Sequence, residues 1–417
     1  MPEIINLASR IEKQLPKKLS SFIRAAGKVA QKQQQRLYLV GGVVRDLLLE
    51  RHTSDIDMVV EGNAIKLAQE MADIIQGRVT PHHRFGTAKV QWDNHMVDIA
   101  MARAESYTEP GALPTVKAGT IGNDLARRDF TINAMAIELN PRHYGELLDS
   151  HNGKNDLEQR LIRVLHEKSF IDDATRIWRA IRYEQRLDFR LELATQELVK
   201  QSTAWLDTIS GDRIRHELEL ILKEELPEKV LRRADELNVL VKLHPSLKGD
   251  TWLTDTFALA RETATTDTPQ PQLYLALMAY RLSADETEQL IVYLKLPKAT
   301  AEILRDTVAI KNKTEELATT GLAPSLIYEL LHGYSLTALT TNSLATDTAT
   351  AAEHIELYLN VLRHVQTSLN GGDLKRMGIP EGPKIKEVLH NLREAKLDGR
   401  VSNKKEEEEM VRGQRIK

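Results

Sequence analysis

The stretches Leu37-Tyr-Leu-Val-Gly-Gly-Val-Val-Arg-Asp46 and Ser54-Asp-Ile-Asp-Met-Val59 decide the fold of the first third of this chain. They predict a strand, a double-glycine turn, a short helix and a second strand. Because alternate residues of a strand share a face, Asp55 and Asp57 are expected to point the same way. Ile56 and Met58 are then expected to point toward the interior.

The two aspartates and the glycine turn together suit a metal-bound triphosphate. Carboxylates about 6–7 Å apart along a strand repel each other unless a cation lies between them, and Mg²⁺ takes carboxylate and phosphate oxygens together. Gly41 and Gly42 allow close approach of the backbone and open a helix whose free N–H groups suit phosphate. Arg45 would add a charged fork to the same phosphates. The alternative is an ordinary strand–turn–helix with solvated aspartates.

The double glycine followed by an Asp-x-Asp strand resembles the nucleotidyltransferase superfamily that includes DNA polymerase beta. The resemblance implies an α+β fold with a polymerase-beta-like head, in which a mixed sheet is combined with helices. The rest of the chain predicts an all-helical C-terminal half after this head.

Composition excludes several classes of protein. The 417 residues are 41% hydrophobic and 28% charged, as in soluble globular proteins. The sequence contains no run of eighteen apolar residues, so no membrane span is expected. The N-terminus lacks the layout of a signal peptide. Zero cysteines exclude disulfides, thiolate metal sites and cysteine nucleophiles. We therefore expect a cytoplasmic protein without a membrane partner. The net charge of −3 is not that of a bulk nucleic-acid binder, so any polyanion must meet local basic clusters.

Strand-like segments gather between residues 36 and 140, and the sequence after about residue 153 is almost wholly helical. The expected strands are Leu37–Val40, Asp55–Val60, Arg78–Thr80, Thr87–Trp92, Met96–Ala100 and Ala134–Leu139, with a helix at Ala64–Ile75. The Pro- and Gly-containing segment Ser106–Thr115 is expected to be a functional or mobile loop. The expected domains are an N-terminal helical extension (1–35), a nucleotidyltransferase head (36–152), a helical neck with a nucleotide-selecting helix (153–225), a helical body (226–345) and a helical, RNA-binding tail (346–417).

Two further motifs offer charged groups. Asp98 lies on a strand predicted to neighbour that of Asp55 and Asp57, where a third carboxylate would complete a metal site or orient an attacking hydroxyl; a surface aspartate is the open alternative. Arg127-Arg-Asp-Phe-Thr-Ile-Asn133 offers arginines and an aspartate for phosphate and ribose, and Asn133 for a cap or a sugar contact. By itself the second motif would more often be a structural ion pair.

A third motif runs from Phe170 to Tyr183. On a helix, Asp173, Arg176 and Arg179 would form one stripe, which Arg182 and Arg186 extend. A carboxylate beside a guanidinium can pair with the edge of a base, and the other arginines would serve phosphates. The alternative is an exposed salt-bridge ladder, which few acids in the stripe support.

The order of these motifs resembles the class II tRNA nucleotidyltransferases, which comprise the CCA-adding enzymes and the bacterial poly(A) polymerases. The resemblance runs from about Leu37 to Phe189, including the linking segment 149–163, and weakly includes Ser210–Glu217. The family's glutamates before the base-selecting aspartate and before the later arginine are replaced by Asp172 and Asp212, which puts fine positioning in doubt.

The resemblance implies a role for each matching residue. Asp55 and Asp57 would hold Mg²⁺ and, with Asp98, form the catalytic group. The implied nucleotide-binding residues are Gly41, Gly42, Arg45, Arg128, Asp129, Asn133, Asp173, Arg176, Arg179 and Arg182. Among these, Asp173 and Arg176 would select C or A, and Arg179 and Arg182 would support the triphosphate.

The implied function is CCA addition or repair, with CTP and ATP as donors and the tRNA 3′ end as acceptor. A poly(A) polymerase or an enzyme that adds only A stays open, whereas the complete 105–115 loop disfavours an enzyme that adds only CC. A helical RNA-binding protein with an inactive head is a rival, against which the intact carboxylates argue. Transfer to a small molecule leaves the long helical half unexplained, and the lack of an adjacent His-Asp pair disfavours a phosphohydrolase.

Overall fold

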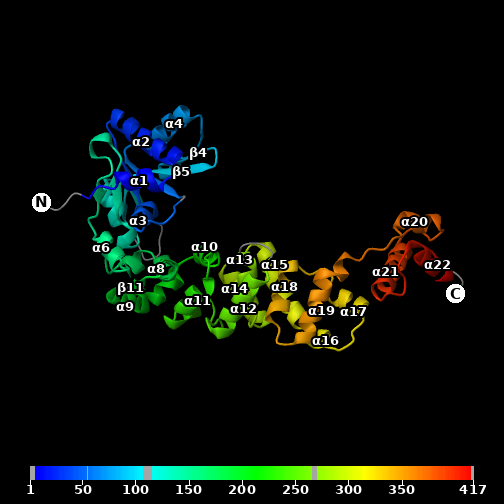
Figure 1. The fold of residues 1–417 in the computed structure, drawn as a ribbon. Coiled ribbons are helices and arrows are strands. Elements are labelled where there is room, and N and C mark those ends of the chain that lie inside the picture. Colours follow the sequence, from blue (N-terminus) through cyan, green and yellow to red (C-terminus); the bar gives the residue numbers. More distant parts are fainter. Residues whose placement is uncertain (1–4, 54, 107–114, 265–269, 415–417) are drawn as a thin grey trace. The chain divides into compact units, whose positions relative to one another are not determined.

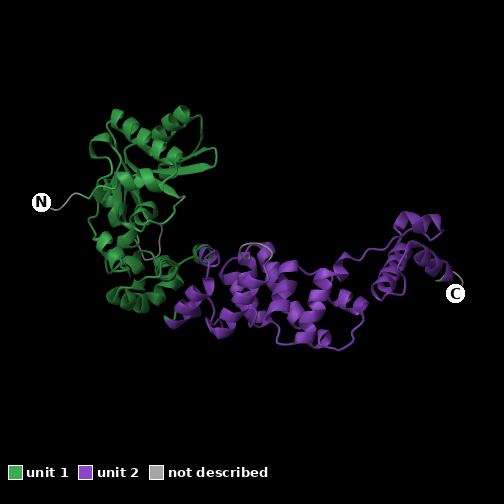
Figure 2. Cartoon of the chain, viewed as in Figure 1, with its two compact units in different colours: residues 1–217, 237–239 green, residues 218–236, 240–417 purple. Residues whose placement is uncertain are grey.

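The computed structural model describes residues 5–53, 55–106, 115–264 and 270–414 (Figure 1). The chain divides into two compact units (Figure 2). Unit 1 comprises residues 1–217 and 237–239, and unit 2 comprises residues 218–236 and 240–417. The finer five-part division expected from the sequence stays a prediction. Most of the expected loop 106–115 lies outside the described residues.

A mixed seven-stranded sheet forms the centre of unit 1. Its strands run in the order β3-β4-β5-β2-β1-β8-β9, and β2 and β5 are parallel while the other neighbouring pairs are antiparallel. The strands are β1 (Arg36–Val40), β2 (Ile56–Glu61), β3 (Arg78–His82), β4 (Thr87–Trp92), β5 (His95–Met101), β8 (Ala136–Glu138) and β9 (Leu147–Leu148). All six expected strands are therefore present, and the α+β head is confirmed.

Two-stranded elements that the sequence did not indicate complete the strands of unit 1. They are the antiparallel pair β6 (Arg103–Ser106) and β7 (Thr115–Ala118), and the parallel pair β10 (Leu161–Ile162) and β11 (Arg190–Leu191). The first pair flanks the segment expected to be a loop. Both pairs are short and depend on partners distant in sequence, so no local pattern marks them.

Helices cover both faces of the sheet. The helices of unit 1 are α1 (Ala8–Gln14), α2 (Lys17–Lys32), α3 (Gly42–Leu48), α4 (Ala64–Ile75), α5 (Ile121–Ala126), α6 (Gly153–Glu158), α7 (Ser169–Asp172), α8 (Thr175–Leu187) and α9 (Leu193–Ser202), and α10 (Gly211–Ile221) crosses into unit 2. Helix α2 packs against β1 and α4. A Cβ on Gly27 of α2 would lie 2.0 Å from the carbonyl oxygen of Leu139, so the close approach requires glycine. On the other face, Ile121 and Leu125 of α5 pack against the sheet.

One helix boundary corrects the expected arginine stripe. Helix α8 begins at Thr175, and Asp173 lies before it with an extended backbone (φ −146°, ψ 98°). The Asp173 side chain accepts hydrogen bonds from the Thr175 backbone N–H and hydroxyl (3.0 and 2.6 Å). Such local bonding favours the end of a helix over its interior, so Asp173 does not continue the stripe of Arg176 and Arg179.

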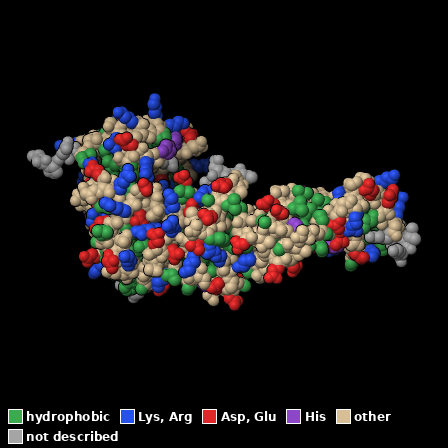
Figure 3. All heavy atoms as spheres, turned by 60° about the horizontal axis from the view of Figure 1, so that its bottom comes forward, with side chains coloured by type: hydrophobic (Ala, Val, Ile, Leu, Met, Phe, Trp, Pro, Cys, Tyr) green, Lys and Arg blue, Asp and Glu red, His purple; other side chains and the backbone are tan. Residues whose placement is uncertain are grey.

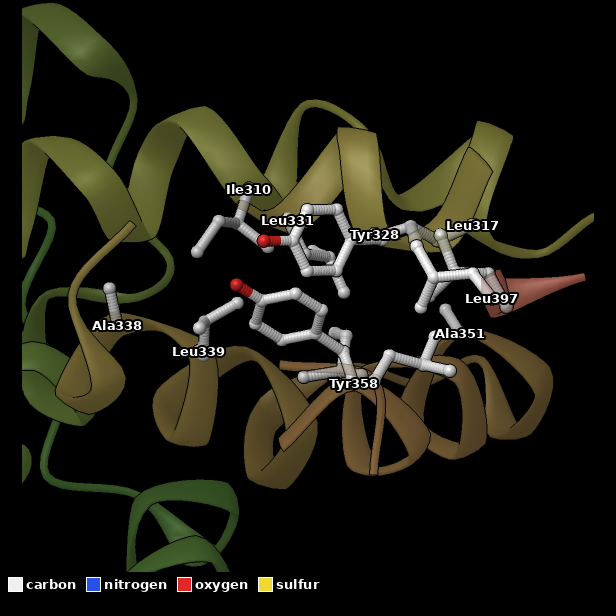
Figure 4. Close-up of a cluster of buried hydrophobic side chains, with 12 residues drawn as sticks. Ile310, Leu317, Tyr328, Leu331, Ala338, Leu339, Ala351, Tyr358 and Leu397 are labelled. Atoms are coloured by element: carbon white, nitrogen blue, oxygen red, sulfur yellow. The ribbon is translucent and has the colours of Figure 1, made fainter. Parts of the chain in front are cut away.

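The described residues of unit 2 form helices joined by turns and loops, with no strand among them. Its helices are α11 (Pro227–Glu236), α12 (Thr251–Glu262), α13 (Pro271–Ala279), α14 (Ala284–Tyr293), α15 (Lys298–Lys311), α16 (Thr314–Leu317), α17 (Pro324–Leu331), α18 (Leu336–Ala345), α19 (Ala349–Asn360), α20 (Gly371–Arg376), α21 (Pro383–Leu397) and α22 (Lys404–Gln414). One core cluster contains buried side chains from each of the helices α15 through α19 and from the end of α21 (Figure 4). The rings of Tyr328 and Tyr358 lie beside each other there, with centroids 5.7 Å apart and planes tilted by 56°.

The surface carries charges of both signs. On the face shown in Figure 3, basic and acidic side chains are interspersed, in keeping with the net charge of −3. Within the described part of the chain, no helix is both long and apolar enough to cross a bilayer.

Candidate functional site

Three carboxylates meet where two parallel strands run side by side. Asp57 of β2 lies directly opposite Asp98 of β5, and Asp55 precedes β2 by one residue. Oxygens of the three side chains all lie within 4.8 Å of one another. Ile56 and Met58 are buried on the opposite face, as expected from the alternation. The predicted proximity of Asp98 to the aspartate pair is confirmed.

The negative charge of the three aspartates is only partly compensated by neighbouring cationic side chains. Burial, together with the charge of Asp55, raises the pKa of Asp57 to about 6. Lys89 on β4 offsets part of the charge, with its Nζ 3.4 Å from Asp98. Three convergent carboxylate oxygens with one partly exposed lysine fit a hard divalent cation such as Mg²⁺. The donor set therefore suits the metal that the sequence predicted.

The glycine turn lies against Arg128, whose charge acts on the carboxylates. Gly41 caps α3 with φ +74°, and a Cβ on it would lie 2.7 Å from Nη1 of Arg128. Only glycine combines this conformation with so close a contact. The charge of Arg128 lowers the pKa of Asp57, against the effect of burial. Arg128 also donates two hydrogen bonds to Asp124, which fix its guanidinium.

Arg45 does not present the free fork expected from the sequence. Its side chain is buried and donates to Asp46 (2.9 and 3.1 Å) and to Asn133 (2.8 Å). The guanidinium also lies 5.3 Å from the centre of the Tyr183 ring. Its guanidinium is thus engaged with Asp46 and Asn133 in the structure, and its contact with the triphosphate stays a prediction.

A pocket of about 360 Å³ lies beside Arg128. Its lining is predominantly cationic and consists of Arg103, Glu105, Arg127, Arg128, Asp129, Asp173, Arg176 and Arg179. The volume is in the range of small-molecule sites, and an excess of arginine suits a phosphorylated ligand. Of the residues predicted to bind nucleotide, Arg128, Asp129, Asp173, Arg176 and Arg179 line this pocket. Gly41, Gly42, Arg45, Asn133 and Arg182 do not.

Asp129 fixes the orientation of Arg179. Nε and Nη2 of Arg179 both donate to Oδ2 of Asp129 (2.9 and 2.6 Å), and Asn133 donates to Oδ1 (3.0 Å). Burial by itself would raise the pKa of Asp129, but the Arg179 charge and these hydrogen bonds outweigh it and lower the pKa to about 2. The carboxylate is therefore ionised and holds one edge of Arg179 in place.

Arg176 and Arg182 of α8 are held by residues of other elements. Arg176 donates to the hydroxyl of Ser169 (2.8 Å) and to the carbonyl of Arg127 (2.7 Å). Arg182 is buried, with Nη2 3.6 Å from Glu217 of α10. Arg179 and Arg182 thus meet acids that are distant in sequence, and Arg182 does not line the pocket.

Asp173 meets a residue whose direct role was not predicted. Nη2 of Arg213 lies 2.8 Å from Oδ1 of Asp173, the oxygen that Thr175 also contacts. These contacts of the described residues leave Oδ2 as an acceptor. Asp172 and Asp212 are the two positions where the family has glutamate. Oδ2 of Asp172 lies 3.8 Å from Nε2 of His166, and Oδ1 of Asp212 lies 3.2 Å from Nη2 of Arg215. Neither residue lines the pocket.

The sequence reasoning missed residues of the pocket and one residue beside the carboxylate cluster. Glu105 pairs with Arg103 (2.8 Å) and Arg127 (3.2 Å), and Lys89 pairs with Asp98. Alternation on β4 and β5 would have indicated Lys89, because it lies directly opposite Asp98. No local signal marks Arg103 or Glu105, which the β6–β7 pair brings to the site.

Comparison with known proteins places this geometry in context. A model of the poly A polymerase head domain matches residues 37–163, and a model of the probable RNA and SrmB-binding site of polymerase A matches residues 188–250. The chain is 32% identical to the A-adding tRNA nucleotidyltransferase of Halalkalibacterium halodurans over 92% of this chain and 90% of that protein. It is 34% identical to the A-adding tRNA nucleotidyltransferase of Geobacter sulfurreducens over 97% of this chain, which spans about half (48%) of that relative's length.

Solved structures extend the similarity over the whole chain. The Thermotoga maritima CCA-adding enzyme complexed with tRNA has a TM-score of 0.79 at 32% identity, covering 99% of this chain and 100% of that one. A CCA-adding enzyme complexed with ATP has a TM-score of 0.82 at 31% identity, covering 99% and 100%. The complex of a CCA-adding enzyme with CTP has a TM-score of 0.81 at 32% identity, covering 99% of each chain.

Proposed function

The chain belongs to the tRNA nucleotidyltransferase family that includes the CCA-adding and A-adding enzymes, and on this premise we propose that it adds C and A to the 3′ end of tRNA. The donors would be CTP and ATP, and pyrophosphate would be released. The proposal is supported by the three-carboxylate cluster beside an arginine-lined pocket within one compact unit.

The carboxylate cluster would carry the chemistry. Asp55, Asp57 and Asp98 are the residues that would hold Mg²⁺. When bound, Mg²⁺ supplies charge stabilisation at the phosphates and acidifies the attacking hydroxyl. A bond would form between the RNA 3′ oxygen and the α-phosphorus, and the bond from that phosphorus to the pyrophosphate would break. The raised pKa of Asp57 follows from burial and the charge of Asp55, which Arg128 and Lys89 offset only in part, so a further cation would favour the ionised carboxylate.

The arginines would hold the triphosphate and exclude alternative orientations. Arg128 is fixed by Asp124 between the glycine turn and the pocket, and Arg179 is fixed by Asp129. Because both guanidiniums are oriented before the nucleotide binds, little side-chain entropy is lost on binding. This arrangement suits a ligand with several phosphates.

Asp173 and Arg176 would read the base. Asp173 retains Oδ2 as an acceptor, and Arg176 presents donors whose orientation Ser169 and the Arg127 carbonyl fix. An acceptor beside a donor can pair with the edge of C or of A in the absence of a nucleic-acid template. Substitution of Asp173 by Asn should therefore change the ratio of kcat/KM for CTP to kcat/KM for ATP. The total activity with the two nucleotides should change less than this ratio.

The decisive test of the metal assignment is the double substitution Asp55→Ala and Asp57→Ala. Incorporation of CMP and AMP into tRNA that lacks its terminus should fall below detection, because two of the three metal-holding carboxylates are lost. The exposed Asp188→Asn substitution is the control and should leave incorporation intact, because asparagine tolerates the left-handed backbone of this residue (φ 58°). Undiminished incorporation by the double variant would refute the assignment.

A second candidate is addition of A only. It is favoured by the A-adding relatives, which are 34% and 32% identical over more than nine-tenths of this chain. Products on tRNA ending before CCA, at CC and at CCA, with CTP alone, ATP alone and both, separate the candidates. Full CCA requires both nucleotides, A-only addition extends only the CC end, and a long A tail would indicate a poly(A) polymerase. No incorporation on any acceptor would favour the inactive RNA-binding protein.

A further inference from the structure

A second group of metal-ligating side chains lies in unit 2, on the helices α17 and α21. Glu329 of α17 and His390 and Glu394 of α21 place one ligand atom each within 4.8 Å of the others. His390 and Glu394 are four residues apart and therefore share one face of their helix. Glu329 reaches them from the neighbouring helix. None of the three has a part in nucleotide transfer as proposed above.

The two separations from the His390 nitrogen are close to those of metal ligands, and the oxygens of Glu329 and Glu394 lie within 4.8 Å of each other. Nε2 of His390 lies 3.1 Å from Oε1 of Glu329 and 3.6 Å from Oε1 of Glu394. In a tetrahedral site with bonds of about 2.0–2.1 Å, ligand atoms lie about 3.3–3.4 Å apart. A single ring nitrogen can donate a proton to only one of the two carboxylates. A simple histidine–glutamate pair therefore leaves the second glutamate unexplained.

The scaffold under these side chains is fixed on both helices. Asp398 accepts hydrogen bonds from the backbone N–H and the hydroxyl of Ser325, both of 3.0 Å. Leu397 packs into the same core cluster as Tyr328 (Figure 4). These contacts hold the two helices together independently of the candidate ligands, so little reorganisation would be needed to bind an ion.

An open hollow adjoins the three side chains. It has a volume of about 410 Å³ and includes Glu329, His390 and Glu394 in its lining. Arg393 lines it too, but its guanidinium donates to the Tyr328 hydroxyl (3.2 Å) and lies 5.5 Å from the centre of that ring. Three protein ligands beside open space leave room for water or another ligand at a fourth position.

We propose that Glu329, His390 and Glu394 form a site for a divalent transition-metal ion of the Zn²⁺ class, which fastens α21 to α17. Imidazole nitrogen combined with carboxylate oxygen suits Zn²⁺, whereas Mg²⁺ prefers oxygen ligands alone. The site is thus chemically distinct from the aspartate cluster of unit 1. Its occupancy would stabilise the attachment of α21 to the helices of the main cluster.

The test uses the full chain carrying Asp55→Asn and Asp57→Asn, so that the aspartate cluster does not contribute. Calorimetric titration with Zn²⁺ should show one site, and His390→Ala or Glu329→Gln should weaken its affinity about tenfold or more. Amide hydrogen exchange in α21 should slow with Zn²⁺ in the parent and remain unchanged in His390→Ala.

The matched control is His143→Ala, because among the residues that the structure describes His143 pairs with a single carboxylate, that of Glu146 (3.0 Å). It should bind Zn²⁺ as the parent does. The proposal is overturned if the parent binds no Zn²⁺, if both ligand substitutions bind it with the parent's affinity, or if the control loses as much affinity as they do. Since the side chain of His390 is 54% exposed, its substitution should not prevent folding.

Discussion

Asp129→Asn is expected to destabilise unit 1 in a pH-dependent way. The folded protein lowers the pKa of Asp129 from its ordinary 3.8 to about 2. Since one pKa unit corresponds to about 1.4 kcal/mol, the ionised carboxylate contributes about 2 kcal/mol at pH 7. Because the folded pKa is the lower one, this stability is present above pH 4 and is lost as the pH falls toward 2. Roughly half of it should remain at pH 3.

The assay is urea denaturation followed by tryptophan emission on a Trp252→Phe background. The remaining tryptophans, Trp92, Trp178 and Trp205, then report on unit 1 alone. The difference between the parent and Asp129→Asn should be about 2 kcal/mol at pH 7 and should shrink by nearly half at pH 3. Asp188→Asn, at an exposed ion pair, is the control and should change little. A difference below about 0.5 kcal/mol at pH 7, or one that is the same at both pH values, would refute the reasoning.

Three further substitutions probe the site and the core. Gly41→Ala should cost about 1–3 kcal/mol and reduce nucleotide incorporation, because φ is +74° and the new Cβ would displace Arg128; unchanged denaturation and turnover would contradict this. Lys89→Met should tighten Mg²⁺ binding measured by calorimetry, because the cation nearest Asp98 is removed; weaker binding would argue that Lys89 positions the carboxylate. Leu331→Ala should cost about 2–5 kcal/mol in the unfolding of unit 2, since its side chain is fully buried, while equilibrium binding of ATP to unit 1 persists. Loss of ATP binding together with the unfolding of unit 2 would show that the two units unfold together.

The head was predictable because its signals are local. Alternation along β1, β2, β4 and β5 indicates both the strands and their buried faces. Helix α4 has the bounds expected from its apolar period, and Asn63 caps it. The β6–β7 and β10–β11 pairs were missed because strands of two to four residues carry no period of their own.

The candidate site was predictable in part. Asp55 and Asp57 follow from their spacing, and Asp98 from the expectation of adjacent strands. The burial of two arginines was not predictable, since an arginine in a sequence does not show which acids it will meet in the fold. Arg45 and Arg182 are buried against Asp46 and Glu217, and so do not line the pocket.

The sequence by itself determined the strand–turn–helix, the shared face of the two aspartates and the family of the chain, because each depends on residues close together along the backbone. The tertiary structure decided which charges face one another. It paired Asp57 with Asp98 across parallel strands and Arg179 with Asp129 across fifty residues. It also brought Glu329 to His390 between two helices. Electrostatic energy depends on distance in space, and folding sets that distance independently of separation along the chain.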